Sequence, residues 1–311
     1  KAALFFRMIT LTNTIYDVII VGAGASGLAA AISAKRKNKD LKIAILEAQK
    51  KAGKKILVTG NGRCNLTNTN VNKDFYHGSF DVAPVLKRYS ANKLMAYFSE
   101  LGLVCDTESN GLVYPHSRQA SAVLDVLLME IKRLNIEIIC ECKVELIRKK
   151  SGTFTIKTNN GNYVSKKIVI SCGGKAFPSA GGTGLGLDVI KNLGHKIAPV
   201  SPALCPIQVN SCCIKSLKGI RAKAEVTLFD GSKAVKSEVG EVQFTDSALS
   251  GICVFNLTTL LPKVKSPLIS VNLAKDYSYI ELLNLLNDRK KLFANEPIEN
   301  YFTGLFHKNT G

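Results

Sequence analysis

The sequence lacks the features that mark several classes of protein. No uninterrupted apolar run reaches the roughly 18–20 residues that a membrane-spanning helix needs. There is also no long-period repeat and no low-complexity tract. With 311 residues, of which 46% are hydrophobic and 21% charged, the chain has an ordinary globular composition and the length of two domains. We therefore expect a soluble protein without a membrane span.

Acidic residues are scarce relative to basic ones. The chain has 24 Asp and Glu against 42 Lys and Arg, which gives a net charge of +18. Such a surplus suits a nucleic-acid partner. However, the basic residues are interleaved with other residue types, as on solvated faces; Lys35, Lys37, Lys39 and Lys42 are an example. No recognition motif accompanies them. We do not expect nucleic acid to be a partner.

Cysteine patterns typical of metal sites and redox disulfides are also missing. The nine cysteines include no C-x-x-C pair, and neither Cys140-Glu141-Cys142 nor Cys212-Cys213 has zinc-ligand spacing. On a strand, Cys140 and Cys142 would share one face and pack as small hydrophobes. An odd number of cysteines fits a reducing cytosol. We expect a cytoplasmic protein with no metal site and no disulfide-reductase chemistry.

The most informative stretch present is residues 19–30, where a β-branched strand runs into G-x-G-x-x-G. Gly22 permits a tight turn, Gly24 lets the backbone approach a pyrophosphate, and Gly27 allows close packing of helix on strand. Ala25 and Ser26 open the helix, whose N-terminal N–H groups attract phosphate. The pattern predicts a dinucleotide-binding turn.

A second apolar strand, residues 42–46, ends in Glu47 and Ala48. Glu47 stands twenty residues past Gly27, where an acid that binds ribose hydroxyls is expected. An adenine dinucleotide with a free ribose hydroxyl pair is therefore the predicted ligand. These residues alone suit either FAD or NAD, so an NAD-only dehydrogenase stays open at this point.

The run T-G-N-G-R-C-N-L-T-N at residues 59–68 is the second informative stretch. Its glycines permit unusual backbone angles, and Arg63 can pair with a phosphate or a flavin carbonyl. The Asn and Thr side chains add further polar contacts. We expect cofactor contacts from Gly62, Arg63, Cys64 and Asn65.

Periodicity in the middle of the chain predicts a Rossmann-like α/β domain with a small β-meander. Residues 117–134 have the pattern of an amphipathic helix, and residues 136–147 that of a strand. A hairpin is expected over residues 154–165, and a strand over 167–171 runs into Cys172, Gly173 and Gly174. A returning strand with this Gly-Gly pair favours FAD over NAD.

Three prolines in residues 198–206 indicate a domain boundary. We expect an FAD-binding domain over residues 1–198, of which 1–14 are flexible. An inserted β-rich domain should occupy residues 199–275, with strands at 224–229, 239–244 and 268–273. A helical segment should follow over residues 276–311.

Four separated motifs, in order along residues 16 to about 255, resemble those of the BaiN-like or aminoacetone-oxidase-like bacterial NAD(P)/FAD-dependent oxidoreductases. The matching segments are residues 22–27, 60–68 with Tyr114-Pro115, 172–186, and 240–251. Asp246 stands where the family commonly has His. The family's closing segment, which returns to the FAD domain and covers the flavin, is absent from these 311 residues.

The resemblance implies a Rossmann-like FAD domain with an inserted β-barrel-like domain and the start of a small helical domain. It implies that Gly22–Gly27 hold the pyrophosphate and Glu47 the adenosine ribose. Val144 would meet the adenine through its backbone, Gly173-Gly174 would pass close to the dinucleotide, and Arg63 would lie towards the flavin.

We therefore expect an FAD-dependent oxidoreductase acting on a small organic substrate. Electrons would come from the substrate or NAD(P)H and pass through the flavin to oxygen or an organic acceptor. Only one full G-x-G-x-x-G is present, so no second nucleotide domain for NAD(P)H is visible. The alternative is a non-catalytic flavin- or RNA-binding module that uses its basic surface. The sequence assigns no catalytic residue and no oligomeric state.

Overall fold

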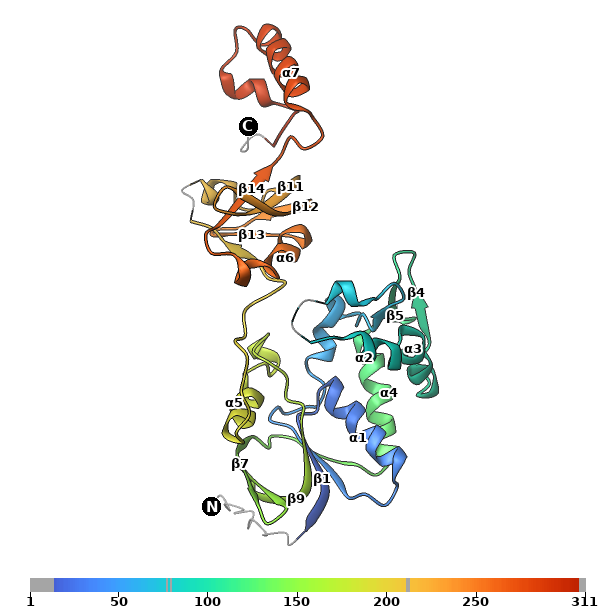
Figure 1. The fold of residues 1–311 in the computed structure, drawn as a ribbon. Helices are drawn as coiled ribbons and strands as arrows, with labels where there is room; N and C mark the ends of the chain where they lie inside the picture. The colour runs from blue at the N-terminus through green and yellow to red at the C-terminus, as the bar shows by residue number, and fades with distance from the viewer. Residues whose placement is uncertain (1–13, 77, 79, 211–212, 308–311) are drawn as a thin grey trace, which may run out of the picture. The chain divides into compact units, whose positions relative to one another are not determined.

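The computed structural model of the protein describes residues 14–76, 78, 80–210 and 213–307. The expected flexible segment, residues 1–14, lies outside this range except for Thr14. Contacts within the chain divide it after Ala198 into two compact units. Figure 1 shows the helices and strands of both units.

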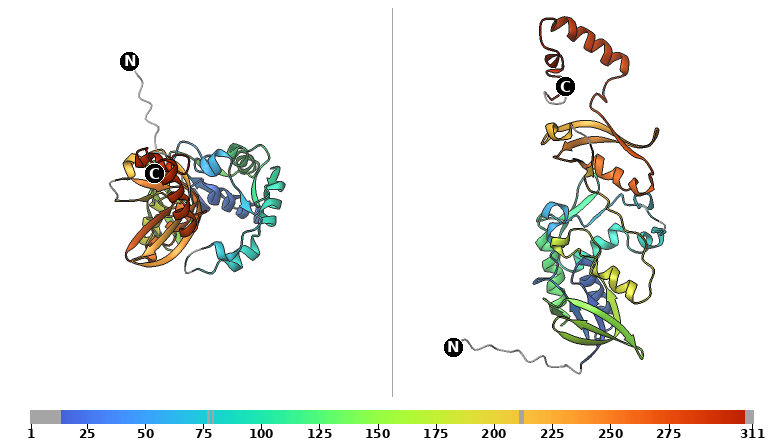
Figure 2. Two further views of the ribbon diagram at one scale, coloured as in Figure 1. Left: turned by 90° about the horizontal axis from the view of Figure 1, so that it is seen from above. Right: turned by 90° about the vertical axis from the view of Figure 1, so that its left-hand side faces the viewer.

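The first unit is built on a six-stranded sheet with the strand order β6-β2-β1-β9-β8-β7. The strands are Ile15–Val21 (β1), Ile43–Leu46 (β2), Glu137–Ile139 (β6), Val144–Lys150 (β7), Thr153–Thr158 (β8) and Gly161–Ile170 (β9). β6, β2, β1 and β9 are parallel, whereas β7, β8 and β9 form an antiparallel meander, seen in green in Figure 2. The predicted Rossmann-like sheet with a meander is confirmed.

The pairing register brings three strand ends together. Val21 of β1 pairs with Leu46 of β2 on one side and with Ile170 of β9 on the other. The residues that follow, Gly22, Glu47 and Ser171, therefore leave the sheet side by side at its carboxyl edge. Ligands of parallel α/β sheets bind at this edge.

Helices cover both faces of the sheet. Residues alternate along β1, so that Ile20 faces a core formed with α1 and α4 while Ile19 faces the core of the meander and α5. α1 and α4 run side by side (Figure 1), joined by an ion pair of 2.7 Å between Arg36 and Glu130. The helices are Ala25–Lys37 (α1), Ala83–Arg88 (α2), Ala91–Glu100 (α3), Ala120–Arg133 (α4) and Leu185–Asn192 (α5).

Shorter elements complete the first unit. A three-stranded sheet has the order β3-β5-β4. Its strands and the 3₁₀ helices are Thr67–Asn68 (β3), Cys105–Thr107 (β4), Leu112–Pro115 (β5), Ile56–Gly62 (η1), Lys73–Phe75 (η2) and Pro178–Ala180 (η3). α4 begins three residues later than its hydrophobic pattern indicated, because Arg118 has a φ of 54° and cannot be helical.

The strand expected over residues 136–147 is the main error of the sequence-based prediction. The segment forms two strands, β6 and β7, which lie at opposite edges of the sheet. Glu141 has a φ of 54°, a left-handed conformation that breaks an extended chain. Cys140 and Cys142 consequently lie in the connection and not on one strand face. Cys142 is nonetheless buried, and burial raises the pKa of its thiol.

The second unit contains a five-stranded antiparallel sheet in the order β10-β13-β12-β11-β14. Its strands and neighbouring helices are Ile207–Gln208 (β10), Arg221–Asp230 (β11), Lys233–Phe244 (β12), Ala248–Ser250 (β13), Pro267–Asn272 (β14), Ile214–Leu217 (η4), Ile252–Thr258 (α6) and Leu261–Lys263 (η5). Val226, Val242 and Leu257 pack in its core. Within the described residues the sheet is open, with β10 and β14 at its edges, so it differs from the barrel-like form expected.

The helical segment predicted near the end of the chain is present. α7 (Tyr279–Leu292) begins with a capping box formed by Ser278 and Glu281. Arg289 donates hydrogen bonds to the carbonyl groups of Tyr301 and Thr303, which ties α7 to η6 (Ile298–Phe302).

Candidate functional site

A cavity of about 780 Å³ opens at the carboxyl edge of the six-stranded sheet. Its walls include Gly22, Glu47 and Ser171, the residues that follow β1, β2 and β9. This volume lies within the range of natural cofactor and ligand sites. All residues that line the cavity belong to the first unit.

The glycine turn has the geometry that its spacing predicted. Gly22 has a φ of 103°, and a Cβ atom there would lie 2.7 Å from Cα of Cys172. A Cβ atom on Gly27 would lie 1.9 Å from the Gly22 carbonyl oxygen. Gly22 therefore allows the turn and Gly27 allows α1 to pack on β1.

Gly24 differs from these two glycines. Its φ is −79°, which any residue can adopt, and a Cβ atom there would have no protein atom within 4 Å. Neither backbone strain nor protein packing requires a glycine at this position. The space that a side chain would fill lies beside the N-terminus of α1, which has no side-chain cap and no acidic residue in its first turn. Free N–H groups and open space at a helix N-terminus suit a phosphate group.

Glu47 is held by two main-chain amides. Its Oε2 accepts a hydrogen bond of 2.7 Å from Ala23, and its Oε1 accepts one of 2.8 Å from Gln49. These bonds fix the carboxylate beside the glycine turn, and each oxygen keeps a further lone pair for a hydroxyl donor. The main-chain carbonyl of Glu47 accepts from the N–H of Cys142, which brings Val144 to the same wall of the cavity.

The residues that follow β9 lie on the other side of the glycine turn from Glu47, because β1 lies between β2 and β9. The Ser171 hydroxyl donates to the carbonyl oxygens of Val21 and Gly22, at 2.9 and 3.0 Å. Cys172 packs against Gly22, and Gly173 has a φ of 74°. A Cβ atom on Gly174 would meet no protein atom within 4 Å, so open space continues along this segment.

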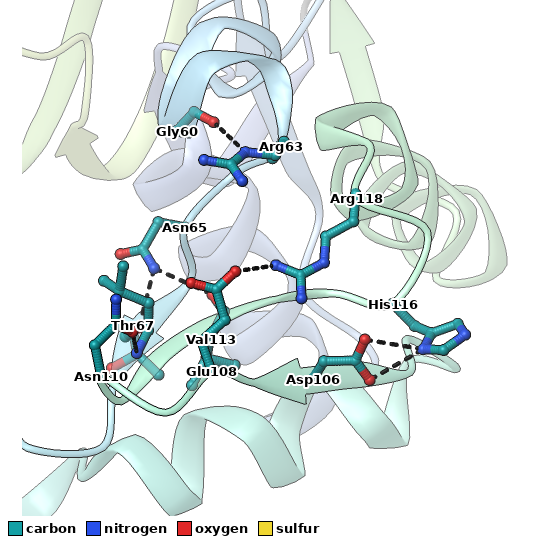
Figure 3. Close-up of polar contacts among 11 residues, drawn as sticks. Gly60, Arg63, Asn65, Thr67, Asp106, Glu108, Asn110, Val113, His116 and Arg118 are labelled. Atoms are coloured by element: carbon teal, nitrogen blue, oxygen red, sulfur yellow. Dashed lines mark hydrogen bonds and ion pairs between the residues drawn. The ribbon is translucent and has the colours of Figure 1, made fainter.

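The segment of residues 59–65 is sharply kinked. Gly60, Asn61, Gly62 and Cys64 all have φ between 54° and 80°. Asn65 stabilises the kink, because its Nδ2 donates to the carbonyl groups of Thr67 and Val113 at 3.2 and 3.3 Å (Figure 3). The kink places Cys64 and Asn65 on the cavity wall.

Arg63 points to a different neighbour. Its guanidinium lies 4.8 Å from the ring centroid of Tyr114, and that of Arg118 lies 5.0 Å from the same ring. Arg118 is paired with Glu108 at 2.6 Å, whereas Arg63 has only the Gly60 carbonyl at 3.4 Å among the contacts in Figure 3. Within the described part of the chain, no acidic side chain lies within 4 Å of Arg63.

The structure brings most of the sequence-predicted site residues to one cavity. The cavity wall includes Gly22, Gly24, Ala25, Ser26, Glu47, Ala48, Cys64, Asn65, Val144, Cys172 and Gly173. Four predicted residues are not on it, namely Gly27, Gly62, Arg63 and Gly174. Gly27 lies where α1 packs on β1, and the kink directs Arg63 towards Tyr114.

Two groups of wall residues were not predicted from the sequence. One is a set of lysines, Lys51, Lys54, Lys55 and Lys143. The other is an apolar lining that includes Leu94, Tyr97, Phe98, Val123 and Leu127. The Lys54-Lys55 pair directly before η1 was a visible signal for the first group. The second group comes from α3 and α4, and only the fold places it beside the glycine turn.

The described residues contain no group of three or more His, Cys, Asp or Glu side chains arranged to hold a metal ion. None of their helices combines the length and the apolar character needed to cross a lipid bilayer.

Comparisons with solved structures give only distant likenesses. Thioredoxin reductase from Streptococcus pyogenes is 19% identical, with 52% of this chain and 36% of that chain covered and a TM-score of 0.31. E. coli quinol fumarate reductase is 18% identical, with 52% and 33% covered and a TM-score of 0.40. The chain thus matches about a third of the length of each.

Comparisons of sequence are more specific. The model of the HI0933-like protein Rossmann domain matches residues 16–265. A 3-dehydro-bile acid delta(4,6)-reductase of Clostridium scindens is 32% identical over 295 residues, 93% of this chain and 72% of the relative. A ribosomal RNA dihydrouridine synthase of Escherichia coli is 24% identical over 290 residues, with 92% and 70% covered. The chain therefore belongs to the HI0933-like family, and its resemblance to the BaiN-like flavin-dependent oxidoreductases is confirmed.

Proposed function

We propose that the chain binds FAD in the cavity of its first unit and reduces a carbon–carbon double bond conjugated to a carbonyl group. The cofactor assignment rests on two features of the same cavity: a Glu47 carboxylate fixed by main-chain amides, and open space beside Gly24. An adenine dinucleotide offers a ribose hydroxyl pair to the first and a pyrophosphate to the second. In this proposal residues 1–198 are the FAD-binding domain, residues 199–275 are an inserted β-rich domain, and residues 276–311 are a helical segment.

Different residues of the cavity wall would contact different parts of the cofactor. N–H groups at the start of α1, from Ala25 and Ser26 onward, would hold the pyrophosphate, and Glu47 would hold the adenosine ribose. The main chain at Val144 would meet the adenine. Cys64 and Asn65 would lie towards the flavin, and Gly173 would pass close to the dinucleotide. When bound, FAD supplies the hydride-transfer chemistry, and the protein supplies binding and orientation.

The remaining role of the protein is to keep the site rigid and dry. Asn65 ties the kinked segment to β3 and β5, so the wall towards the flavin does not depend on loop closure. Apolar side chains of α3 and α4 line the inner cavity. A wall of this kind excludes water, which protects a reduced centre from side reactions.

The substrate class rests on the relatives. One is named for reduction at a delta(4,6) position of a 3-dehydro-bile acid and another for making dihydrouridine. Both names describe saturation of a carbon–carbon double bond conjugated to a carbonyl group. This shared chemistry favours an unsaturated organic acceptor over oxygen. NAD(P)H is the proposed electron donor, reacting without a dedicated second Rossmann domain.

A spectrum tests the cofactor and the reaction in sequence. The purified protein should be yellow and release FAD, not FMN, on denaturation. Anaerobic NADH or NADPH should bleach the flavin, and a small α,β-unsaturated ketone should restore its colour with formation of the saturated product. A folded, colourless protein that FAD cannot reconstitute would overturn the cofactor assignment. Reoxidation by oxygen but by no unsaturated acceptor would overturn the reductase assignment alone.

A second candidate acceptor is a uracil base in RNA. The net charge of +18 favours it, as do two relatives named as ribosomal RNA dihydrouridine synthases. Incubation of the reduced protein with unmodified ribosomal RNA would then form dihydrouridine, and RNA binding would weaken steeply with salt. Turnover of a small ketone with no dihydrouridine formed would exclude this candidate.

A further inference from the structure

Arg63 is an exposed cation without a carboxylate partner, at the end of the kinked segment. Its Nε donates one long hydrogen bond, of 3.4 Å, to the Gly60 carbonyl. Within the described residues its two Nη groups donate to no protein acceptor. The planar guanidinium therefore keeps the pair of parallel N–H donors that matches the two oxygens of a carboxylate.

The other basic side chains drawn in Figure 3 are already paired. Arg118 is paired with Glu108 at 2.6 Å, and Nδ1 of His116 lies 3.0 Å from both carboxylate oxygens of Asp106. Arg63 is thus the basic side chain of this group that has no carboxylate. A single unpaired cation complements a ligand group with one negative charge. A phosphate monoester carries close to two negative charges at neutral pH and would call for a second unpaired cation.

The ring of Tyr114 restricts the direction of the Arg63 guanidinium, which lies 4.8 Å from the ring centroid. The ring is itself held in place, since Tyr114 is only 5% exposed. A Cβ atom on Gly60 would lie 3.4 Å from Cε1 of the ring. Stacking limits the orientations of the long arginine side chain before any ligand binds, so less conformational entropy is lost on binding.

Arg63 lies at the edge of the cavity and not on its wall. Cys64 and Asn65, the next two residues of the chain, line the wall. Because adjacent Cα atoms are about 3.8 Å apart, the Arg63 side chain starts beside the wall and extends towards Tyr114. In the proposed function Cys64 and Asn65 lie towards the flavin. A group bound by Arg63 would therefore belong to a molecule whose reacting bond lies deeper, beside the flavin.

We infer that Arg63 binds a carboxylate of the substrate at the edge of the cavity, while the conjugated double bond is reduced inside it. The substrate is then an α,β-unsaturated ketone that carries a carboxylate away from the reacting carbons. This inference rests on the proposed function and narrows its substrate class. It gives Arg63 a role different from the cofactor contact that the sequence pattern indicated.

Two ketones separate recognition of the carboxylate from the reaction itself. They are cyclohexenones that differ only at the end of a short alkyl chain, which carries a carboxylate in one compound and its methyl ester in the other. Values of kcat and KM would be measured for both with FAD-loaded protein and NADH or NADPH. Calorimetry would measure binding of the carboxylate compound to the oxidised protein.

The variants are Arg63→Gln and Arg63→Lys, with Arg148→Gln as the matched control. Arg148 is an exposed arginine of the same unit, on β7, that does not line the cavity. The FAD content of every variant would be determined from its absorption spectrum. This measurement separates a contact with the substrate from a contact with the cofactor.

The wild-type protein should prefer the carboxylate compound to its ester. In Arg63→Gln the ratio of the two kcat/KM values should fall about tenfold. The fall should come through KM and not kcat, and calorimetry should show a matching loss of affinity. Arg63→Lys should recover part of the preference, because an ammonium keeps the charge but not the planar pair of donors. Arg148→Gln should match the wild type, and FAD content should be the same in all variants.

Two kinds of result would overturn the inference alone. If both ketones are reduced but the ratio is the same in the wild type and in Arg63→Gln, Arg63 does not bind the carboxylate and the proposed function stands. If Arg63→Gln loses FAD and both ketones lose activity equally, Arg63 acts on the cofactor. If the wild-type protein reduced neither ketone, the reductase proposal would fail and the inference with it.

Discussion

The carbonyl oxygen of Gly22 lies 1.9 Å from the position that a Cβ atom of residue 27 would occupy. Backbone and not a flexible side chain fills that space, so Gly27→Ala should separate α1 from β1. We expect the free energy of unfolding to fall by about 1–3 kcal/mol, the usual cost of overpacking. Urea denaturation of the ligand-free protein would measure it. An unchanged midpoint would show that the turn is looser than described.

Gly24→Ala should weaken FAD binding and leave the stability of the ligand-free protein nearly unchanged. Its Cβ atom would meet no protein atom within 4 Å, so the stability of the ligand-free protein should stay within about 0.5 kcal/mol of the wild type. FAD affinity should fall, because the methyl group occupies space reserved for the pyrophosphate. Titration with FAD, monitored by flavin fluorescence, would show it. Full FAD affinity in a stable Gly24→Ala protein would contradict the proposed position of the cofactor.

Glu47→Gln keeps the shape of the side chain but removes its charge. If the carboxylate accepts hydrogen bonds from the ribose, FAD binding should weaken by about 1.5–3 kcal/mol. FMN has no adenosine, so its affinity should not change. The ratio of the two affinities, measured with wild-type and variant protein, therefore reports on the ribose contact. A parallel loss for FMN would indicate that Glu47 acts through its bonds to Ala23 and Gln49.

The buried Glu130 carboxylate predicts a pH dependence of stability. Hydrogen bonds from Arg133, and also from Arg36, hold the pKa of Glu130 at about 2, below its ordinary value of 4.5. Because the pKa is lower in the folded than in the unfolded state, the charged carboxylate stabilises the folded protein at every pH above the unfolded-state pKa. That stability is lost as the pH falls from about 4.5 towards 2. The contribution at neutral pH is about 3 kcal/mol, since the shift is about 2.5 pKa units at about 1.4 kcal/mol each.

Glu130→Gln tests this directly. At pH 7 the variant should unfold at lower urea concentration, because Arg133 loses its carboxylate partner and Arg36 keeps only that of Glu100. Between pH 5 and pH 2 its stability should decline less steeply than that of the wild type. Identical slopes for the two proteins across this interval would show that another carboxylate governs the acid transition.

Tyr97 presents a buried hydroxyl with no hydrogen-bond partner in the described structure. Its ring contacts Phe98 edge to face, and the Arg36 guanidinium lies 5.8 Å from the ring centroid. Phenylalanine would keep both ring contacts and remove the unsatisfied group. Tyr97→Phe should therefore be as stable as the wild type or more stable by about 1 kcal/mol. A loss of more than about 1 kcal/mol in urea denaturation would mean that the hydroxyl is bonded in solution.

Local chemistry explains which parts of the site could be predicted from sequence. Gly22, Gly27 and Glu47 belong to one β-α-β unit, in which turn geometry and strand pairing depend on neighbouring residues. The glycine spacing predicted the first two, and the apolar strand before Glu47 predicted the third. The kink at residues 59–65 was similarly visible as a concentration of glycine and asparagine.

Contacts between distant segments could not be predicted. The bonds from Lys54 and Lys55 to Ser179 and Ala176 depend on the register of β9 against β1. Arg63 was expected to face the cofactor, but its direction is set by Tyr114, which comes from β5. The strand pattern of residues 136–147 hid a left-handed residue, Glu141, because a positive φ at a non-glycine residue leaves no compositional trace.

The connection between β6 and β7 has a consequence for how this protein can vary. Its N–H groups at Glu141 and Cys142 donate to the main-chain carbonyls of Gln49 and Glu47, at 3.0 and 2.9 Å. This wall of the cavity is thus set by peptide N–H groups, which every amino acid except proline provides. Replacement of the exposed Glu141 side chain by Gly or Asn, which suit its φ of 54°, should be tolerated, whereas insertion or deletion of one residue would move Val144 out of place. Homologues should therefore vary in the side chains of this connection, without proline at positions 141 and 142, but keep its length constant.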